Sequence, residues 1–98
     1  MIIYISGPMS GLPEMNFPAF AEAAARLREL GHTVISPHEI EQPALTWEAC
    51  MREDIAELLK ADAIAMLPGW GNSKGARLEF FIANELGMQV KHIEELTS

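Results

Sequence analysis

Short apolar runs alternate with longer segments of helical periodicity along the chain. The first run, residues 1–5, is rich in β-branched and aromatic residues and does not alternate, which predicts a strand buried on both faces. Further strands are predicted over residues 32–36 and 61–67, and a fourth begins at residue 88. The spacing of apolar positions between them predicts helices over residues 17–30, 47–60 and 74–86. The acidic tail after the fourth strand has no clear assignment.

The ends of these helices carry recognisable signals. Asn16 is expected to cap the first helix, and Thr46 the second. Gly31 and Gly87 are expected to end the first and third helices. The apolar stripe of the first helix is expected to face the core, and it consists of Phe17, Phe20, Ala24, Leu27 and Leu30.

The predicted element order is β-α-β-α-β-α-β within a single domain, residues 1–98. This order indicates a three-layer α/β fold, a Rossmann- or flavodoxin-like parallel sheet of about four strands with helices on both faces. Ligands of such sheets bind beyond the carboxyl ends of the strands. A site is therefore expected among the loops over residues 6–16, 36–45 and 68–75.

Composition and charge narrow the possible functions. The chain has 14 acidic and 7 basic residues, a net charge of −7, which disfavours nucleic acid polymers and anionic membranes as partners but allows a small nucleotide in a local pocket. The single cysteine, Cys50, excludes an internal disulfide and a cysteine-rich zinc site. No uncharged stretch is long enough to span a bilayer, and the N-terminus does not resemble a signal peptide, so a cytoplasmic protein is expected.

The loop after the first strand is the first candidate site. Ser6, Gly7, Pro8 and Met9 follow the strand and precede a helix, and small residues there let a ligand approach the backbone. The loop matches neither the dinucleotide-binding glycine pattern nor a Walker loop. A ligand-binding loop and a plain strand-to-helix turn are both consistent with these residues.

Two carboxylates interrupt apolar surfaces. Asp54 lies on a helical stripe with Met51 and Leu58, so it is expected to be paired, protonated or functional, or else to form an ordinary ion pair. Glu79 lies early in a largely apolar helix, whose N-terminus is expected to keep it ionised; a surface ion pair is the alternative. Two such carboxylates near one cleft suit a nucleophile and a general acid.

Other residues give weaker signals. Trp70 stands between two glycines in a loop, where it is placed to stack on a base, and Ser73 is suited to cap the third helix. Lys74 and Arg77 are more typical of surface charges than of ligands. The three histidines lack the spacing of metal ligands, so no metal is expected.

Together, Tyr4-Ile5-Ser6-Gly7-Pro8, Asp54 with Asp62 eight positions later, and Ser73-x-Gly75-x-x-x-Glu79 resemble the nucleoside 2-deoxyribosyltransferase superfamily. The resemblance is greatest to its short DUF4406-type branch and extends over roughly residues 1–90. The superfamily also includes the deoxynucleoside 5′-monophosphate N-glycosidases.

The resemblance implies roles for individual residues. Glu79 matches the nucleophile that attacks C1′ of the deoxyribose, Tyr4 a tyrosine that orients it, and Asp54 an aspartate that protonates the departing base. Ser73 matches a serine that the monophosphate enzymes associate with the 5′-phosphate. The substrate-binding residues are therefore expected to be Ser6, Gly7, Pro8, Met9, Trp70, Ser73 and Gly75.

The sequence also departs from the better-known members. The first loop lacks the arginine that the monophosphate enzymes use near the phosphate, and Arg77 is the only nearby substitute. No residue among 91–98 matches the C-terminal residues that a neighbouring subunit contributes in those enzymes.

The first functional hypothesis is cleavage or exchange of the N-glycosidic bond of a 2′-deoxynucleoside or its 5′-monophosphate. It requires no cofactor, because the carboxylates supply the chemistry, and a homodimer or larger oligomer is expected to close the pocket. The alternative is a non-catalytic nucleotide-binding module that uses the same pocket as a sensor. A third interpretation is a small acidic interaction protein without a ligand.

Overall fold

A four-stranded parallel sheet forms the centre of the protein. The computed structural model describes residues 1–41 and 46–97, so the last four residues of the predicted loop 36–45 lie outside the described residues. The strands stand in the order β2-β1-β3-β4, and every neighbouring pair is parallel. Their bounds are β1 Ile2–Ser6, β2 Thr33–Ile35, β3 Ala63–Met66 and β4 Gln89–His92.

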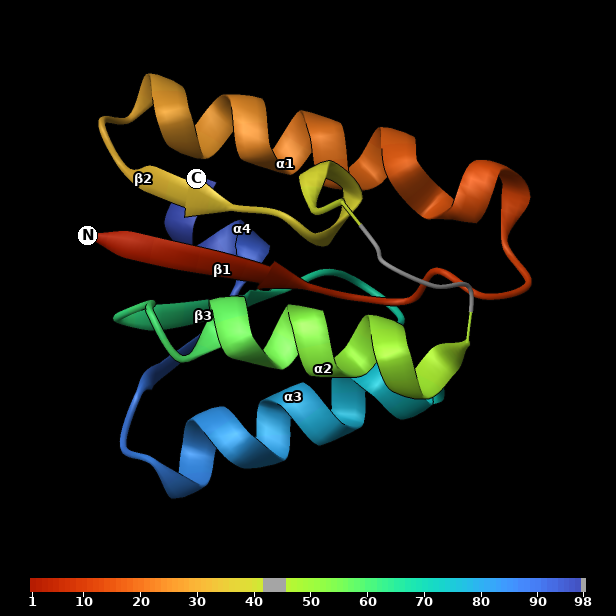
Figure 1. Cartoon of the computed structure of the whole chain (residues 1–98). Helices are drawn as coiled ribbons and strands as arrows, with labels where there is room; N and C mark the ends of the chain where they lie inside the picture. The colour runs from red at the N-terminus through yellow and green to blue at the C-terminus, as the bar shows by residue number, and fades with distance from the viewer. Residues whose placement is uncertain (42–45, 98) are drawn as a thin grey trace.

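Helices cover both faces of this sheet, as the sequence predicts. The helices are α1 Phe17–Glu29, α2 Trp47–Leu58, α3 Lys74–Glu85 and α4 Ile93–Thr97. One face carries α1 and the short α4, and the other carries α2 and α3 side by side (Figure 1). Three short 3-10 turns lie in the loops, at Pro13–Asn16, Pro37–Glu39 and Trp70–Asn72.

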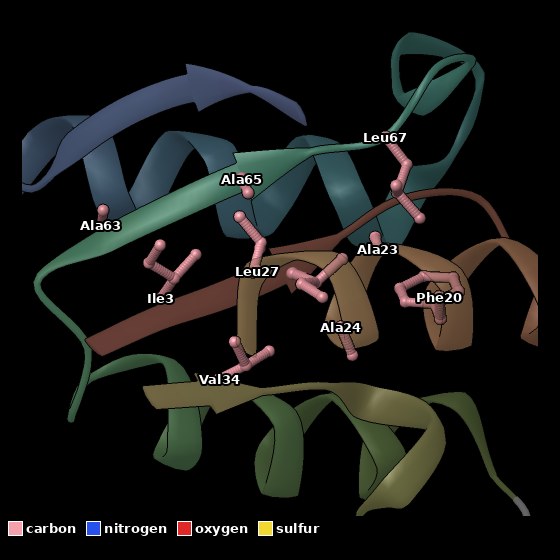
Figure 2. Packing of buried hydrophobic residues seen from close by; sticks show 10 residues of the cluster. Ile3, Phe20, Ala23, Ala24, Leu27, Val34, Ala63, Ala65 and Leu67 are labelled. Carbon is pink, nitrogen blue, oxygen red and sulfur yellow. The ribbon is translucent and has the colours of Figure 1, made fainter. Parts of the chain in front are cut away.

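The central strand β1 divides its side chains between two cores. Ile3 and Ile5 point to the α1 face, where they join buried residues of α1 such as Phe20 and Leu27 (Figure 2). Tyr4, between them in sequence, points to the opposite face and packs among residues of α2 and α3. This alternation follows from the two-residue period of a strand. The alternation of side chains along β1 therefore determines which of them can contact α3.

The carboxyl ends of the strands meet at one edge of the sheet. The arrows of β1 and β2 point to the same side in Figure 1, and α1, α2 and α3 all begin there. The amide of Leu67, just after β3, donates to the carbonyl oxygen of Ser6 at 2.8 Å, which holds the two strand ends together. The expected location of a site is therefore built from β1, β3 and the first turns of these helices.

Two residues of the predicted apolar stripe of α1 are not in the core. Phe17 and Leu30 are 41% and 58% exposed, whereas Phe20, Ala24 and Leu27 are buried. A helix of 13 residues spans about 20 Å, while a strand of five residues spans about 17 Å. Phe17 is the first residue of α1 and Leu30 is its C-cap, so the two exposed residues stand at the ends of the helix and the three buried ones lie between them.

The predicted cap at Asn16 is wrong in its mechanism. Asn16 occupies the N-cap position of α1, but its side chain accepts no hydrogen bond there; its Nδ2 donates to the carbonyl oxygen of Pro8 at 2.9 Å. Glu14, Met15 and Asn16 all have φ between 54° and 59°, the left-handed region. Because a left-handed N-cap cannot present its side chain to the first turn, Asn16 ties the turn to the preceding loop instead.

The acidic tail has a structure that its composition did not indicate. Residues 93–97 form α4, and the amide of His92 donates to Oε1 of Glu95 at 2.9 Å at its start. Ile93 and Leu96 pack against the core on the α1 face. Within residues 1–41 and 46–97, no helix has the length and apolar character needed to cross a membrane.

Leu27 in α1 and Leu30 at its C-cap provide a direct test of this packing. Leu27→Ala removes a fully buried side chain, so we expect it to lower the free energy of unfolding by about 2–5 kcal/mol. Leu30→Ala, at the exposed end of the same helix, should change it by less than about 0.5 kcal/mol. Urea unfolding of both variants measures the difference, and equal losses would contradict the packing.

Candidate active site

The side chains of Tyr4 and Ser6 reach the same helix from one strand. They are two residues apart on β1, so both point to the face covered by α2 and α3. Both are fully buried. Ser6 is the last residue of β1 and lies nearer to the carboxyl edge of the sheet than Tyr4.

Glu79 is the acceptor for both hydroxyl groups. The hydroxyl of Tyr4 donates to Oε2 of Glu79 at 2.5 Å, and the hydroxyl of Ser6 donates to Oε1 at 2.7 Å. Glu79 lies in the second turn of α3 and is only 4% exposed. Each carboxylate oxygen therefore has a separate hydrogen-bond donor from β1.

Burial changes the ionisation of this cluster. Removal from water raises the pKa of the Glu79 carboxyl to about 7; the hydrogen bonds from Tyr4 and Ser6 oppose the rise, and the charge of Asp54 adds to it. The sequence predicted an ionised Glu79, but burial raises its pKa enough that both forms are present at neutral pH. Burial, together with the negative charges of Glu79 and Asp54, also raises the pKa of Tyr4 well above its usual range.

Asp54 is the second carboxylate of the site. It is 8% exposed and lies on the stripe of α2 that also buries Met51 and Leu58, as the sequence predicted. Its charge contributes to raising the pKa of both Tyr4 and Glu79, so Asp54 lies within electrostatic range of both groups. The structure thus brings together the three residues to which the sequence assigned chemistry.

The loop after β1 is built for close packing. A Cβ atom on Gly7 would lie 2.7 Å from Cβ of Leu67, so only glycine lets the loop pass the end of β3 at this distance. The carbonyl oxygen of Pro8 accepts the hydrogen bond from Asn16, and Met9 packs against the core on the α1 face. Each of these three predicted substrate-binding residues therefore has a packing or hydrogen-bonding role within the protein.

The start of α3 contains the remaining predicted site residues. Ser73 caps the helix as predicted, since its hydroxyl accepts from the amide of Ala76 at 3.2 Å. Gly75 faces α2, where a Cβ atom would lie 3.0 Å from Sδ of Met51. Trp70 is half-buried, with its ring 4.8 Å from that of Phe80.

Two basic side chains lie near this helix start. Nζ of Lys74 is 4.0 Å from the ring centroid of Trp47, in a cation–π contact. Nη1 of Arg77 donates to the carbonyl oxygen of Gly71 at 3.1 Å, so the guanidinium group lies along the loop between β3 and α3. Both side chains are exposed except for these contacts.

The structure separates other polar residues from the cluster. Ser36 is buried after β2, and its hydroxyl lies 2.5 Å from Nδ1 of His38, whose ring contacts Phe17 and Phe20 on the α1 side. Asp62 precedes β3 at the opposite edge of the sheet, where its Oδ2 accepts from the amide of Ile2 at 2.8 Å. Both are structural contacts away from Glu79.

Sequence reasoning missed the contact of Ser6 with Glu79. Ser6 was assigned to the substrate-binding loop, but it is the last residue of β1. The two-residue alternation of a strand was the available signal, because it places Ser6 on the face of Tyr4.

Two cavities lie beside the site rather than over it. One of about 450 Å³ lies between the end of β2 and α2, and its lining includes Ser36, Ile40, Glu53 and Glu57. The other, about 210 Å³, lies between α1 and α4. Glu79 lines neither cavity. Among the described residues, no three His, Cys, Asp or Glu side chains are grouped so that they could hold a metal ion.

Comparisons with known proteins concern the family and the fold of the chain. A family model described as "Domain of unknown function (DUF4406)" matches residues 1–92. The fold is similar to that of a 2-deoxyribosyltransferase from the psychrotolerant bacterium Bacillus psychrosaccharolyticus, with a TM-score of 0.73 and 26% sequence identity. That alignment covers 92% of this chain and 69% of the other. No curated protein sequence matches the chain.

The raised pKa of Glu79 makes the stability dependent on pH. The pKa of Glu79 in the folded protein is about 7, against a usual value of 4.5. The free energy of unfolding therefore falls as the pH rises from about 4.5 to about 7, and the loss stays constant at higher pH. Glu79→Gln removes this penalty. We therefore expect its stability relative to wild type to be higher at pH 8 than at pH 5, by on the order of 2 kcal/mol.

Urea unfolding at both pH values measures this difference. Glu85→Gln is the matched control, because Glu85 is exposed at the end of the same helix. Its stability relative to wild type should be nearly the same at both pH values. A pH-independent effect of Glu79→Gln would contradict the raised pKa.

Proposed function

The chain belongs to the DUF4406 family, which is nucleoside 2-deoxyribosyltransferase-like, and we propose that it cleaves or exchanges the N-glycosidic bond of a 2′-deoxynucleoside or its 5′-monophosphate. The observation that carries this proposal is the buried Glu79 carboxyl, which two hydroxyl groups hold beside a second carboxylate. An oriented glutamate with its own hydrogen-bond donors suits nucleophilic attack on a sugar carbon.

The first step forms a covalent glycosyl-enzyme. A lone pair of the ionised Glu79 carboxylate forms a bond to C1′ of the sugar, and the bond between C1′ and the base nitrogen breaks with its electron pair on the base. Asp54, which must be protonated at the start of this step, donates its proton to the departing base. Tyr4 holds the carboxylate in position throughout this step.

The second step releases the sugar. Water attacks C1′ and gives its proton to Asp54, and the bond between C1′ and Glu79 breaks to restore the carboxylate. If a second base attacks instead, its nitrogen takes the place of water, and the product is a new nucleoside. Burial of Glu79 favours transfer, because it limits access of water to the intermediate.

The start of α3 supports a 5′-monophosphate as one substrate form. Ser73 opens the helix, and the exposed cations Lys74 and Arg77 flank it in an otherwise acidic protein. A helix start with nearby cations is favourable for a phosphate group. The small-molecule partner that we propose is a deoxynucleoside or its 5′-monophosphate.

Removing the nucleophile tests the proposal. Wild type, Glu79→Ala and the exposed control Glu85→Ala are incubated with the four deoxynucleosides and their 5′-monophosphates, with and without a second free base. Chromatography should show base release or exchange by wild type and Glu85→Ala, and a loss of at least about 1,000-fold in Glu79→Ala. Equal turnover by folded Glu79→Ala would overturn the mechanism.

The role of Asp54 as proton donor can be tested with two bases, of which only one needs a proton in order to leave. We expect Asp54→Asn to slow release of an ordinary base by about 100- to 10,000-fold. A 7-methylated purine already carries a positive charge and leaves without a proton, so its release should be slowed much less. Initial rates on 2′-deoxyguanosine and 7-methyl-2′-deoxyguanosine give the comparison, and equal losses on both would contradict the role of Asp54 as proton donor.

A non-catalytic nucleotide-binding module is the second candidate. The observation that favours it is that Glu79 is almost fully buried and lines neither cavity. Such a module would be stabilised by a nucleotide that remains intact. Thermal unfolding with each nucleotide, followed by chromatography of the same sample, separates the two functions.

A further inference from the structure

The two oxygens of Glu79 are held by donors at different depths in the sheet. Tyr4 donates to Oε2 and Ser6 to Oε1. Along a strand these residues are about 6.6 Å apart, and Ser6 is the one at the carboxyl end. Ligands of parallel sheets bind beyond that end. Oε1 is therefore the oxygen nearer to an incoming substrate.

Nucleophilic attack does not treat the two oxygens alike. The attacking oxygen becomes the single-bonded oxygen of an ester, which is a poor hydrogen-bond acceptor. The other becomes the ester carbonyl oxygen and continues to accept. The hydrogen bond to the attacking oxygen is therefore weakened or lost when the bond to C1′ forms, while the hydrogen bond to the other oxygen is kept.

We propose that Oε1 of Glu79 is the attacking oxygen and that Ser6 is a positioning residue whose hydroxyl holds this oxygen in the free protein and releases it during attack. The inference rests on the proposed function and deepens it, because it assigns different roles to two donors. Tyr4 keeps its hydrogen bond to Oε2 in both states. The two donors are thus not interchangeable.

The geometry of Ser6 suits a releasable donor. Its backbone is fixed, since Ser6 pairs with Met66 in the sheet and its carbonyl oxygen accepts from the amide of Leu67. Its hydroxyl hydrogen turns about a single Cβ–Oγ bond, so release requires no movement of the strand. The phenol of Tyr4 is held farther from the edge, within the core between β1 and the helices.

Removing either donor should have different consequences. Without the hydrogen bond from Ser6, the ionised form of Glu79 is less favoured and its pKa rises. The acidic limb, which is the fall of kcat/KM at low pH as Glu79 becomes protonated, should therefore move from about pH 7 to a pH about one unit higher. Above this limb, Ser6→Ala should lose much less kcat/KM than Tyr4→Phe, because the hydrogen bond that it lacks is one that attack weakens or breaks. Tyr4→Phe should lower the same plateau about 10-fold or more.

The experiment measures pH profiles of kcat/KM for wild type, Ser6→Ala, Ser6→Thr and Tyr4→Phe. Ser6→Thr keeps the hydroxyl and should restore the acidic limb. Ser36→Ala is the matched control, because Ser36 is an equally buried serine after the neighbouring strand but does not contact Glu79. It should leave the limb unchanged. A plateau for Ser6→Ala as low as that of Tyr4→Phe would overturn the assignment while the proposed function stands.

A second measurement does not depend on turnover. In the free protein, a carbon-13 titration of the Glu79 carboxyl should show a higher pKa in Ser6→Ala than in wild type. An unchanged pKa would refute the hydrogen bond that the inference requires. If wild type turns over none of the substrates, the proposed function fails, and the role of Ser6 in attack fails with it.

Discussion

Burial of one carboxyl group is the constraint that organises this protein. A glutamate that is 4% exposed is costly unless its oxygens are satisfied, and β1 supplies a hydroxyl group for each of them. Those hydroxyls do not abolish the penalty, because the pKa of Glu79 remains raised to about 7. The protein thus maintains an ionisable group that titrates near neutrality at the centre of its fold.

The parallel sheet allows a chain of only 98 residues to hold the buried carboxyl group and its two donors. β1 is a central strand, so its alternating side chains serve two cores at once: Ile3 and Ile5 stabilise the packing of α1, while Tyr4 and Ser6 reach α3. The helices α2 and α3 lie side by side and both begin at the carboxyl edge (Figure 1). Asp54 in α2 and Glu79 in α3 therefore come from neighbouring helices. Structural and candidate catalytic roles therefore share a strand of five residues.

The sequence predicted the layers and strands of the fold well, because apolar runs and glycine or serine signals at helix ends are local features. Ser73 and Thr46 cap their helices as expected. The order of strands, the left-handed turn at residues 14–16 and the packing of α4 depend on tertiary contacts, which no local pattern contains. At the site, the apolar pattern singled out Asp54 and Glu79, and the family resemblance added Tyr4. The contact of Ser6 with Glu79 depends on the exact end of β1.

The distance along the chain between the two halves of the site has a consequence for how the protein is made. The hydrogen bonds to Glu79 join residues 75 and 73 positions apart. During synthesis β1 is made before α3, so Tyr4 and Ser6 have no acceptor until Glu79 has been added to the chain. The closing contacts are among the longest-range in the protein and belong to the slow class of folding events. The site therefore cannot form before α3 has been synthesised, and a nascent chain that stops before α3 contains Tyr4, Ser6 and Asp54 but not Glu79.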